Sequence, residues 1–390
     1  MQYPILRAIK EHPDLDYRLV VSGAHLDNNF GRTIMEIRDD GFDIHAEVAI
    51  DMSGGEKIST ARAIGTGILS LAPVLQTMNP DIFLVYADRF EGFAAVITST
   101  QMNIPTAHVE GGDITEGGAL DDSVRHAMTK LAHFHYTTNE QATNRILAMG
   151  EEPWRVHTVG FPAIDLIVDG TYATPEDLAQ RLKLDLQRPI VLFTQHSVTT
   201  EFAAADSQLH TSLDALTQLA KEGVQVILTY PNNDAGGETI SRTLKEFVAI
   251  GHPNIQLHQS LGRYAYHGVL ALARHKDWRV ACVGNSSSGI KETPVFGCPT
   301  VNIGSRQQGR LRGDNVLDTN YDAKEIYVAV RRCLFDDDFR ARCAATNNPY
   351  GGGNAGKLIA ESLAAIDLDP KHILRKRMML AGECKGDWFR

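Results

Sequence analysis

The stretch WRVACVGNSSSGIKE, residues 278–292, decides the fold class of this chain. An apolar run comes first, a turn of glycine, asparagine and serine follows, and a helical pattern begins after the turn. Because the apolar run does not alternate with polar residues, it predicts a strand buried on both faces, as in parallel sheets covered by helices. The order of strand, small-residue turn and helix therefore indicates a doubly wound α/β fold.

The same order recurs along the chain. Nine more short apolar runs alternate with helical patterns, at residues 17–23, 81–88, 104–112, 134–139, 155–161, 189–196, 224–232, 254–259 and 298–304. The first five form one block, and the others form a second block with 278–286, on either side of the polar stretch DGTYATPED (169–177). We therefore expect two Rossmann-like domains, residues 1–168 and 169–362, followed by a C-terminal helix or tail at 363–390.

Composition narrows the class of protein. A chain of 390 residues is too long for one ordinary core, and its net charge of -10 argues against a general nucleic-acid binder, which needs a basic face. The five cysteines form no CxxC pair, so we expect reduced thiols in a cytoplasmic protein. No apolar stretch approaches the roughly 20 residues of a membrane span, and no signal peptide is visible, so we expect no membrane partner.

Polar or charged residues follow five of the predicted strands, where ligands bind in open parallel sheets. Each is by itself as compatible with a turn or a helix cap as with a site, but five together favour a site. They are Asp88 and Arg89, Glu110 with two glycines, Gln195 and His196, Pro231 with Asn232 and Asn233, and the turn GNSSSGIKE (284–292).

The GNSSSGIKE turn predicts an anion site. Its small residues allow close backbone approach, and the helix that follows offers unpaired N–H groups to an anion. Ser286 and Ser287 add hydroxyl donors, and Glu292 is placed to accept from ribose hydroxyls. The next loop supplies the positive charge that a diphosphate needs, although for at least two of its arginines a solvated loop explains them equally well: Arg306, Arg310 and Arg312.

The stretch HVEGGDITEGGALDDSVRH (108–126) gathers carboxylates and glycines after a strand. Its second half reads as a helix start, with Asp121 or Asp122 near the N-terminus. Arg125 lies three or four residues later, so we expect it to hold one of these carboxylates beside Glu110. The alternative is a surface helix pair, which does not explain the glycines after Glu110.

Three histidines are secondary candidates. His133 and His135 share a strand face, but no third ligand is near them in the sequence, so packing or substrate hydrogen bonding is favoured over a metal site. His25 follows the strand at 17–23.

These motifs carry a family resemblance. HVEGGDITEGGALDDSVRHAMTKLAH, with ADRFE before it and QH, YPNNDAG, GNSSSGIKE and NIGSRQQGR after it, resembles the hydrolysing UDP-N-acetylglucosamine 2-epimerases over residues 1–360. The DDSxRH element is a specific signal, whereas the GNSS turn with a downstream Glu is shared with the non-hydrolysing relatives. Those relatives carry a PEExNR pattern that is absent from this sequence, so the hydrolysing enzymes are the better match.

The resemblance implies a glycosyltransferase-B-like fold whose last helix crosses back onto the first domain. It implies loss of the C2 proton, departure of UDP to leave a glycal, and addition of water to give a free N-acetylmannosamine-type sugar. The expected substrate is UDP-N-acetylglucosamine or a 4-acetamido-6-deoxy analogue, on the way to sialic or legionaminic-type acids. No metal or redox cofactor is needed, and a homo-oligomer, either dimer or tetramer, is expected.

The resemblance also assigns roles to the candidate residues. Asp88 and Glu110 are the base and acid in either order, and Asp122, oriented by Arg125, assists hydration or tunes the pKa of Glu110. The substrate contacts are Arg89, His196, Asn232, Leu261 at the uracil site, Ser286, Ser287, Glu292 at the ribose, and Arg306 at the diphosphate, where His196 also acts in catalysis.

Two rival functions remain open beside this interpretation. A glycosyltransferase of the same fold would need an acceptor, and an inactive sugar-nucleotide sensor would bind without turnover.

The family opens with a strand and a GTRAxYG-like loop, whereas this chain opens with a helical pattern in which Ile5, Leu6 and Ile9 share a face. We therefore expect a strand and such a loop to be encoded upstream of Met1.

Overall fold

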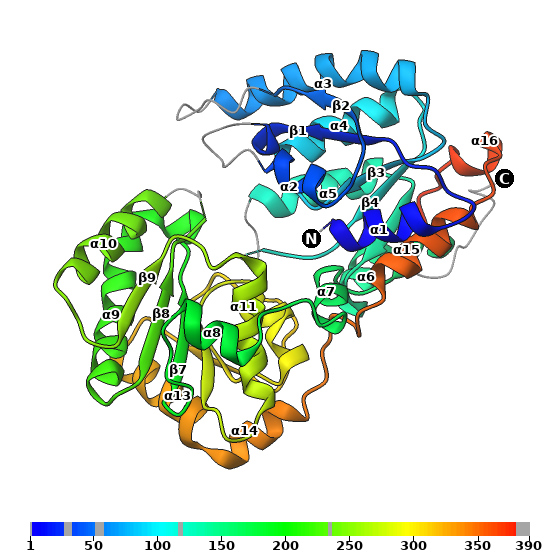
Figure 1. Cartoon of the computed structure of the whole chain (residues 1–390). Helices are drawn as coiled ribbons and strands as arrows, with labels where there is room; N and C mark the ends of the chain where they lie inside the picture. The colour runs from blue at the N-terminus through cyan, green and yellow to red at the C-terminus, as the bar shows by residue number, and fades with distance from the viewer. Residues whose placement is uncertain (1, 27–32, 51–57, 116–119, 233–235, 380–390) are drawn as a thin grey trace. The chain divides into compact units, whose positions relative to one another are not determined.

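The computed structural model describes residues 2–26, 33–50, 58–115, 120–232 and 236–379. The chain divides into two compact units (Figure 1). The first contains residues 1–113, 120–162 and 354–390, and the second contains residues 114–119 and 163–353. The strands that the structure describes all pair in parallel, which confirms the predicted α/β class.

The described strands of the first unit form two sheets, in the orders β1-β2 and β3-β4-β5-β6. Their bounds are β1 (Leu19–Ser22), β2 (Ile44–Val48), β3 (Phe83–Tyr86), β4 (Thr106–Val109), β5 (Phe134–Thr137) and β6 (Val156–Thr158). The helices of this unit are α1 (Tyr3–Glu11), α2 (Ile34–Asp39), α3 (Ser59–Met78), α4 (Phe90–Gln101), α5 (Leu120–Leu131), α6 (Glu140–Ala148), α15 (Ala355–Ala364) and α16 (Pro370–Ile373), with short 3-10 turns η1 (Gly23–His25) and η3 (Pro153–Arg155).

The second unit has one sheet in the order β12-β11-β10-β7-β8-β9. Its strands are β7 (Ile190–Thr194), β8 (Gln225–Thr229), β9 (Ile255–His258), β10 (Val280–Gly284), β11 (Thr300–Ile303) and β12 (Val316–Thr319). Its helices are α7 (Ala163–Val168), α8 (Pro175–Arg181), α9 (Ala205–Lys221), α10 (Gly237–Ala249), α11 (Gly262–Ala271), α12 (Ser288–Lys291), α13 (Ala323–Phe335) and α14 (Asp337–Ala344), with 3-10 turns η4 (Thr199–Ala204), η5 (Leu272–Arg274) and η6 (Thr293–Phe296).

The strand order of the second unit reverses between β7 and β10, which makes their carboxyl ends the topological switch point where ligands bind. Both strands are buried along their whole length, as their unbroken apolar runs predict. Gly284 ends β10 at φ +126°, and a Cβ there would lie 2.0 Å from the carbonyl oxygen of Thr194, so only glycine allows this approach.

All ten predicted strands are present, but two further strands were not predicted. They are β2 and β12, which lie at the edges of their sheets. Each is at most half-buried over most of its length, so neither has the continuous apolar run that marks the central strands. The helical pattern at the start of the chain forms α1, in which Ile5 and Ile9 are buried and Leu6 is half-buried.

The unit boundaries fall at 162/163 and 353/354, whereas we expected them at 168/169 and 362/363. Helix α15 therefore belongs to the first unit rather than the second, and it lies beside α1 (Figure 1). The physical reason is apolar packing: Ile359 and Leu363 of α15 share a buried cluster with Ile5 and Ile9 of α1. The upstream strand expected from the family pattern stays a prediction.

Candidate active site

Two carboxylates follow neighbouring strands of the first unit. Tyr86 of β3 pairs in register with Val109 of β4, so Asp88 and Glu110 leave the sheet at the same edge. Glu110 has φ +65° and Ala87, just before Asp88, has φ +66°. Such backbone costs a non-glycine residue about 1–3 kcal/mol and is typical of functional sites. The sheet therefore holds both carboxylates on strained turns at one edge.

Backbone hydrogen bonds between neighbouring strands keep Ala87 and Glu110 in their strained conformations. The Ala87 N–H donates to the Val109 carbonyl at 3.0 Å, and the Glu110 N–H donates to the Tyr136 carbonyl at 2.9 Å. Each strained residue thus keeps its place in a parallel ladder, so neither turn can relax without breaking a backbone hydrogen bond.

Arg125 of α5 is the counter-ion of this edge. Its side chain is 5% exposed and forms an ion pair and hydrogen bond with Asp88. Burial alone would lower the pKa of Arg125, but the carboxylates of Asp88, Asp113 and Glu110 outweigh burial and raise it above its ordinary value. The guanidinium therefore stays charged and draws these carboxylates together.

The strongest electrostatic partners of Arg125 lie outside its own helix. They are the carboxylates of Asp88, Asp113 and Glu110, which follow β3 and β4, and the expected pairing with Asp121 or Asp122 stays a prediction. Asp122 is buried in the first turn of α5, where its charge acts on His126 one turn later against the pKa-lowering effect of burial. Arg125 therefore joins α5 to the turn that carries Asp88.

Two residues of the site were missed from the sequence. Burial, and then the charge of Glu110, raise the pKa of the Tyr86 hydroxyl well above its ordinary value. Burial lowers the pKa of His108 to about 4, so its imidazole is neutral. The signal was present, because Tyr86 and His108 lie two residues before Asp88 and Glu110, and alternate residues of a strand share a face.

The partners of His108 define its tautomer. Its Nε2 lies 2.7 Å from the Ala87 carbonyl and must carry the proton, while Nδ1 lies 3.3 Å from the Thr129 hydroxyl and accepts. His108 therefore links the strained turn after β3 to the last turn of α5.

The glycines after Glu110 have a packing role. Gly112 has φ +74°, and a Cβ there would lie 2.4 Å from the Ala142 carbonyl oxygen of α6. The Gly112 carbonyl also accepts a hydrogen bond from Arg145 of the same helix. The chain leaving Glu110 therefore runs directly against α6, which only glycine permits. Residues 116–119, in the middle of this stretch, lie outside the described residues.

The other candidates of the first unit have partners elsewhere. Arg89 is 62% exposed and pairs with Glu91 at 3.3 Å. His25 lies in η1 with Nδ1 2.6 Å from the Thr33 hydroxyl, and burial lowers its pKa. Hydrogen bonds also engage His133, which accepts from the Thr106 N–H at 3.0 Å, and His135, which lies 3.1 Å from Glu151.

In the second unit, Asn285 joins the two strands of the switch point. Its side-chain oxygen accepts from the His196 N–H at 2.7 Å, and its amide nitrogen donates to the His196 carbonyl at 2.9 Å. Asn285 is fully buried, so this reciprocal pair fixes the chain after β7 against the chain after β10. Asn285 lies within the GNSSSGIKE turn but was not among the predicted site residues.

His196 presents a neutral imidazole. Burial, together with the charge of Arg306, lowers its pKa to about 3. The Asn232 backbone N–H donates to Nδ1 at 2.9 Å, so the single ring proton lies on Nε2. Asn232 itself is exposed and contributes through its backbone, and Asn233 lies outside the described residues.

The three arginines of the following loop differ. Arg306 donates to the Asn285 carbonyl at 3.2 Å and so lies at the switch point. Arg310 donates to the Ile114 carbonyl at 2.7 Å and to Gln307 at 2.6 Å, and Arg312 pairs with Asp318. Arg306 therefore contacts the residue that is bonded to His196, whereas the contacts of Arg310 and Arg312 hold the loop itself.

The helix predicted after the GNSSSG turn is present but short. Helix α12 has four residues and passes into η6, where Pro294 stands at the first turn. A single turn has little macrodipole, so anion binding at Ser286 and Ser287 would depend on local N–H and hydroxyl donors. Proline explains the early end, because it cannot donate to a continuing helix.

Glu292 is held as an acceptor. One oxygen accepts from Ser288 at 2.8 Å and lies 2.9 Å from His267 Nε2, a residue that sequence reasoning missed. Burial would raise the pKa of Glu292, but His267 and Ser288 outweigh it and lower the pKa. Leu261, just before α11, is half-buried and packs on the cluster that contains Val269.

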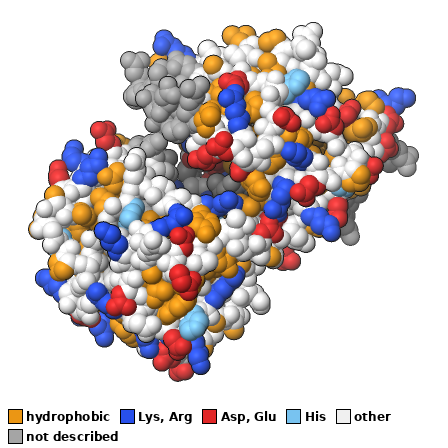
Figure 2. All heavy atoms as spheres, viewed as in Figure 1, with side chains coloured by type: hydrophobic (Ala, Val, Ile, Leu, Met, Phe, Trp, Pro, Cys, Tyr) orange, Lys and Arg blue, Asp and Glu red, His pale blue; other side chains and the backbone are white. Residues whose placement is uncertain are grey.

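The face drawn in Figure 2 shows acidic and basic side chains interspersed over its described part, without a continuous basic surface. Within the described ranges, none of the helices combines the length and apolar character that a bilayer crossing requires. The described side chains also contain no cluster of three or more His, Cys, Asp or Glu placed to hold a metal ion.

Comparison with known proteins identifies the family. The UDP-N-acetylglucosamine 2-epimerase family matches residues 7–364. A UDP-N,N'-diacetylbacillosamine 2-epimerase (hydrolyzing) from Legionella pneumophila is 32% identical, over 93% of this chain and 92% of the relative. A UDP-N-acetylglucosamine 2-epimerase from Neisseria meningitidis is 30% identical, over 94% and 91%. The chain belongs to the UDP-N-acetylglucosamine 2-epimerase family.

Solved structures agree on the fold. The crystal structure of UDP-GlcNAc 2-epimerase from Neisseria meningitidis bound to UDP-GlcNAc superposes with a TM-score of 0.77, covering 93% of this chain and 95% of that one at 17% identity. The predicted glycosyltransferase-B-like architecture of two Rossmann-like domains is therefore confirmed.

Proposed function

We propose that this protein hydrolyses a UDP-2-acetamido sugar with inversion at C2, releasing UDP and a free sugar. The observation that carries the proposal is the pair Asp88 and Glu110, held around Arg125 on strained turns at the ends of neighbouring strands. Two carboxylates in one site suit a reaction with two proton transfers. The family relative from Legionella pneumophila, named as a hydrolysing 2-epimerase, supports the direction of the reaction.

The chemistry divides into elimination and hydration. One carboxylate takes the C2 proton, the C1–O bond breaks, and its electron pair leaves with the diphosphate oxygen of UDP, giving a C1=C2 glycal. Water then adds its hydroxyl to C1, and C2 receives a proton on the opposite face. Asp88 and Glu110 divide the two proton transfers at C2, and the sum is UDP-sugar plus water giving UDP plus the C2-epimeric sugar.

The second unit supplies the groups that bind UDP in this proposal. The His196 Nε2–H and the Arg306 guanidinium donate to the diphosphate, as the charge that develops on the leaving group requires. Ser286 and Ser287 add donors, Glu292 accepts from the ribose hydroxyls, and Leu261 contacts the uracil.

A product analysis tests the function. The protein is incubated in D₂O with UDP-N-acetylglucosamine and, separately, with UDP-N,N'-diacetylbacillosamine, and products are read by mass spectrometry and NMR. We expect free UDP and a free sugar carrying deuterium at C2, and the faster substrate identifies the preferred substituents at C4 and C6. UDP release that requires an added acceptor would instead identify a glycosyltransferase, and binding without turnover would identify a sensor.

A further inference from the structure

The C-terminal strap, residues 370–379, lies on the first unit and is held there by a buried arginine. The Arg155 side chain is fully buried, and its guanidinium donates to three backbone carbonyls of the strap, those of His372 at 3.2 Å, Ile373 at 2.9 Å and Arg375 at 3.3 Å. These bonds fix the path of the strap before it reaches Lys376.

Lys376 extends from the strap to the end of α5. Its Nζ donates to the last carbonyls of that helix and of the residue beyond it: Thr129 at 3.4 Å, Lys130 at 2.8 Å and Ala132 at 2.6 Å. A cation on these carbonyls satisfies groups that have no partner within the helix and complements the negative end of its dipole. Lys376 is therefore a C-terminal cap of α5 supplied from more than 240 residues away.

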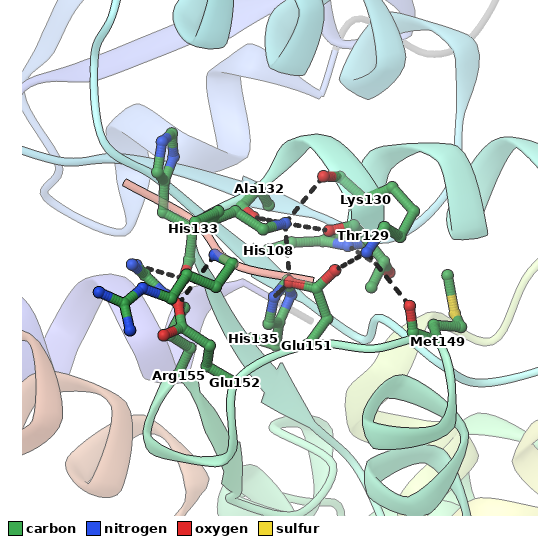
Figure 3. Close-up of polar contacts among 12 residues, drawn as sticks. His108, Thr129, Lys130, Ala132, His133, His135, Met149, Glu151, Glu152 and Arg155 are labelled. Carbon is green, nitrogen blue, oxygen red and sulfur yellow. Dashed lines mark hydrogen bonds and ion pairs between the residues drawn. The ribbon is translucent and has the colours of Figure 1, made fainter. Parts of the chain in front are cut away.

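The same ammonium group binds a buried carboxylate. Glu151 is fully buried, and Lys376 lies 2.7 Å from one of its oxygens. Lys130 and His135 also bind this carboxylate, at 2.5 Å and 3.1 Å (Figure 3). His135 is the register partner of His108 on the adjacent strand. The buried charge is thus compensated from three sides, and removing one partner has a cost.

The last turn of α5 reaches the candidate active site. The Thr129 hydroxyl contacts His108, and His108 donates to the carbonyl of Ala87, directly before Asp88. Arg125, one turn earlier on the same helix, binds Asp88 itself. Two contacts from α5 therefore meet the turn that carries Asp88, and both depend on where the helix ends.

We propose that Lys376 is a positioning residue for the reaction: by capping α5 it holds Arg125 and His108 against the turn that carries Asp88. This inference rests on the proposed function. Misplacement of about 1 Å by a change far from the reacting atoms can lower a rate by about 100-fold. The alternative is that Lys376 only fastens the strap and stabilises the fold.

Lys376→Met removes the cap and keeps the length of the side chain. We expect kcat to fall about 10- to 100-fold with KM and UDP affinity within twofold. Lys130→Met is the matched control, because the Lys130 side chain binds the same Glu151 carboxylate and the Met149 carbonyl. Lys130 takes part in the cap of α5 only through its backbone carbonyl, which the substitution keeps. We expect its kcat within twofold of wild type, and equal losses in the two variants would overturn the inference.

The double variant Lys376→Met/Glu151→Gln separates positioning from stability. Lys376→Met alone leaves Glu151 with one cation fewer, so we expect a lower Tm, and Glu151→Gln removes the uncompensated charge and restores it. A positioning role predicts that kcat stays low after Tm recovers. Recovery of kcat together with Tm would show that Lys376 only stabilises the fold and does not position the active-site residues. The double variant also supplies the comparison if the single variant does not fold.

Hydrogen–deuterium exchange gives a result that does not depend on turnover. The Ala87 and Glu110 amides should exchange faster in Lys376→Met than in Lys130→Met, because both belong to the strained turns beside α5. Unchanged exchange at these amides would overturn the inference. Failure of the wild-type protein to release UDP from either sugar nucleotide would instead overturn the proposed function, and the exchange result would still decide the role of Lys376.

Discussion

The two units use the same kind of parallel sheet, but the strands that carry their candidate residues are not all buried alike. In the second unit the switch-point strands β7 and β10 are buried at every residue. In the first unit β4, which precedes Glu110, is also buried at every residue, whereas β3, which precedes Asp88, is buried at one residue of four. Asp88 thus follows a half-exposed strand, whereas Glu110 and the candidates at the switch point follow strands of the core.

The polar groups of the two units differ as well. At the switch point of the second unit, His196 is neutral, Asn285 is uncharged, and Arg306 adds a cation without a carboxylate among the contacts described for these three residues. At the edge of the first unit, Asp88 and Glu110 surround a charged Arg125. Neutral and cationic donors suit the binding of an anion, whereas carboxylates suit proton transfer. In the proposed function, the second unit therefore binds UDP and the first unit transfers protons.

The largest expected effect tests this division directly. Glu110→Gln keeps the shape of the side chain and removes its proton-transfer capacity, which typically contributes about 10²–10⁴-fold to a rate. We expect kcat to fall by this factor while UDP affinity, measured by calorimetry, stays unchanged. The control is Glu140→Gln, an exposed carboxylate in the first turn of α6. Near-normal turnover in Glu110→Gln would remove Glu110 from the reaction.

The second prediction compares the burial of β7 and β3 by making the same substitution, leucine to alanine, in each strand. Leu192 of β7 is fully buried, and Leu84 of β3 is half-buried. Because a cavity in a buried site costs more than one open to solvent, Leu192→Ala should lower the free energy of unfolding by about 2–5 kcal/mol and Leu84→Ala by less than half of that. Urea denaturation gives the free energies, and hydrogen exchange identifies which sheet opens. Equal losses of unfolding free energy would mean that β3 and β7 are equally well packed.

Most strands and the strand-end positions of the candidate residues could be predicted from the sequence, and what was missed has physical causes. Ten strands were found because unbroken apolar runs follow from burial on both faces, and β2 and β12 were missed because edge strands lack them. Asp88 and Glu110 were predicted as site residues because ligands meet the carboxyl ends of parallel strands, and the structure places both at one edge of a sheet. The ion pair between Arg125 and Asp88 was missed, because local spacing does not reveal a contact made across 37 residues of sequence.

The third prediction uses pH to probe the first unit. The folded pKa of His108 is about 4, below its ordinary value of 6.5, so between these values the unfolded state binds the proton and the folded state does not. The free energy of unfolding is therefore highest above pH 6.5 and decreases as the pH drops toward 4. His108 accounts for a decrease on the order of 3 kcal/mol. Denaturation midpoints should fall more steeply from pH 7 to pH 4.5 in wild type than in His108→Gln. Parallel slopes would mean that His108 is not held neutral.

The smallest expected effect concerns the arginines of the second unit. Arg306 contacts Asn285 beside His196, whereas Arg312 is engaged with Asp318 in the same loop. Arg306→Ala should weaken UDP binding by about 1.5–3 kcal/mol, the contribution of a hydrogen bond to a charged group. Arg312→Ala removes an equal charge from the same loop, so it controls for the general electrostatic attraction of UDP and should change its affinity much less. Calorimetry with UDP alone measures both without turnover. Equal losses in the two variants would mean that the loop acts through its total charge, and UDP binding would then not depend on the contacts at the switch point.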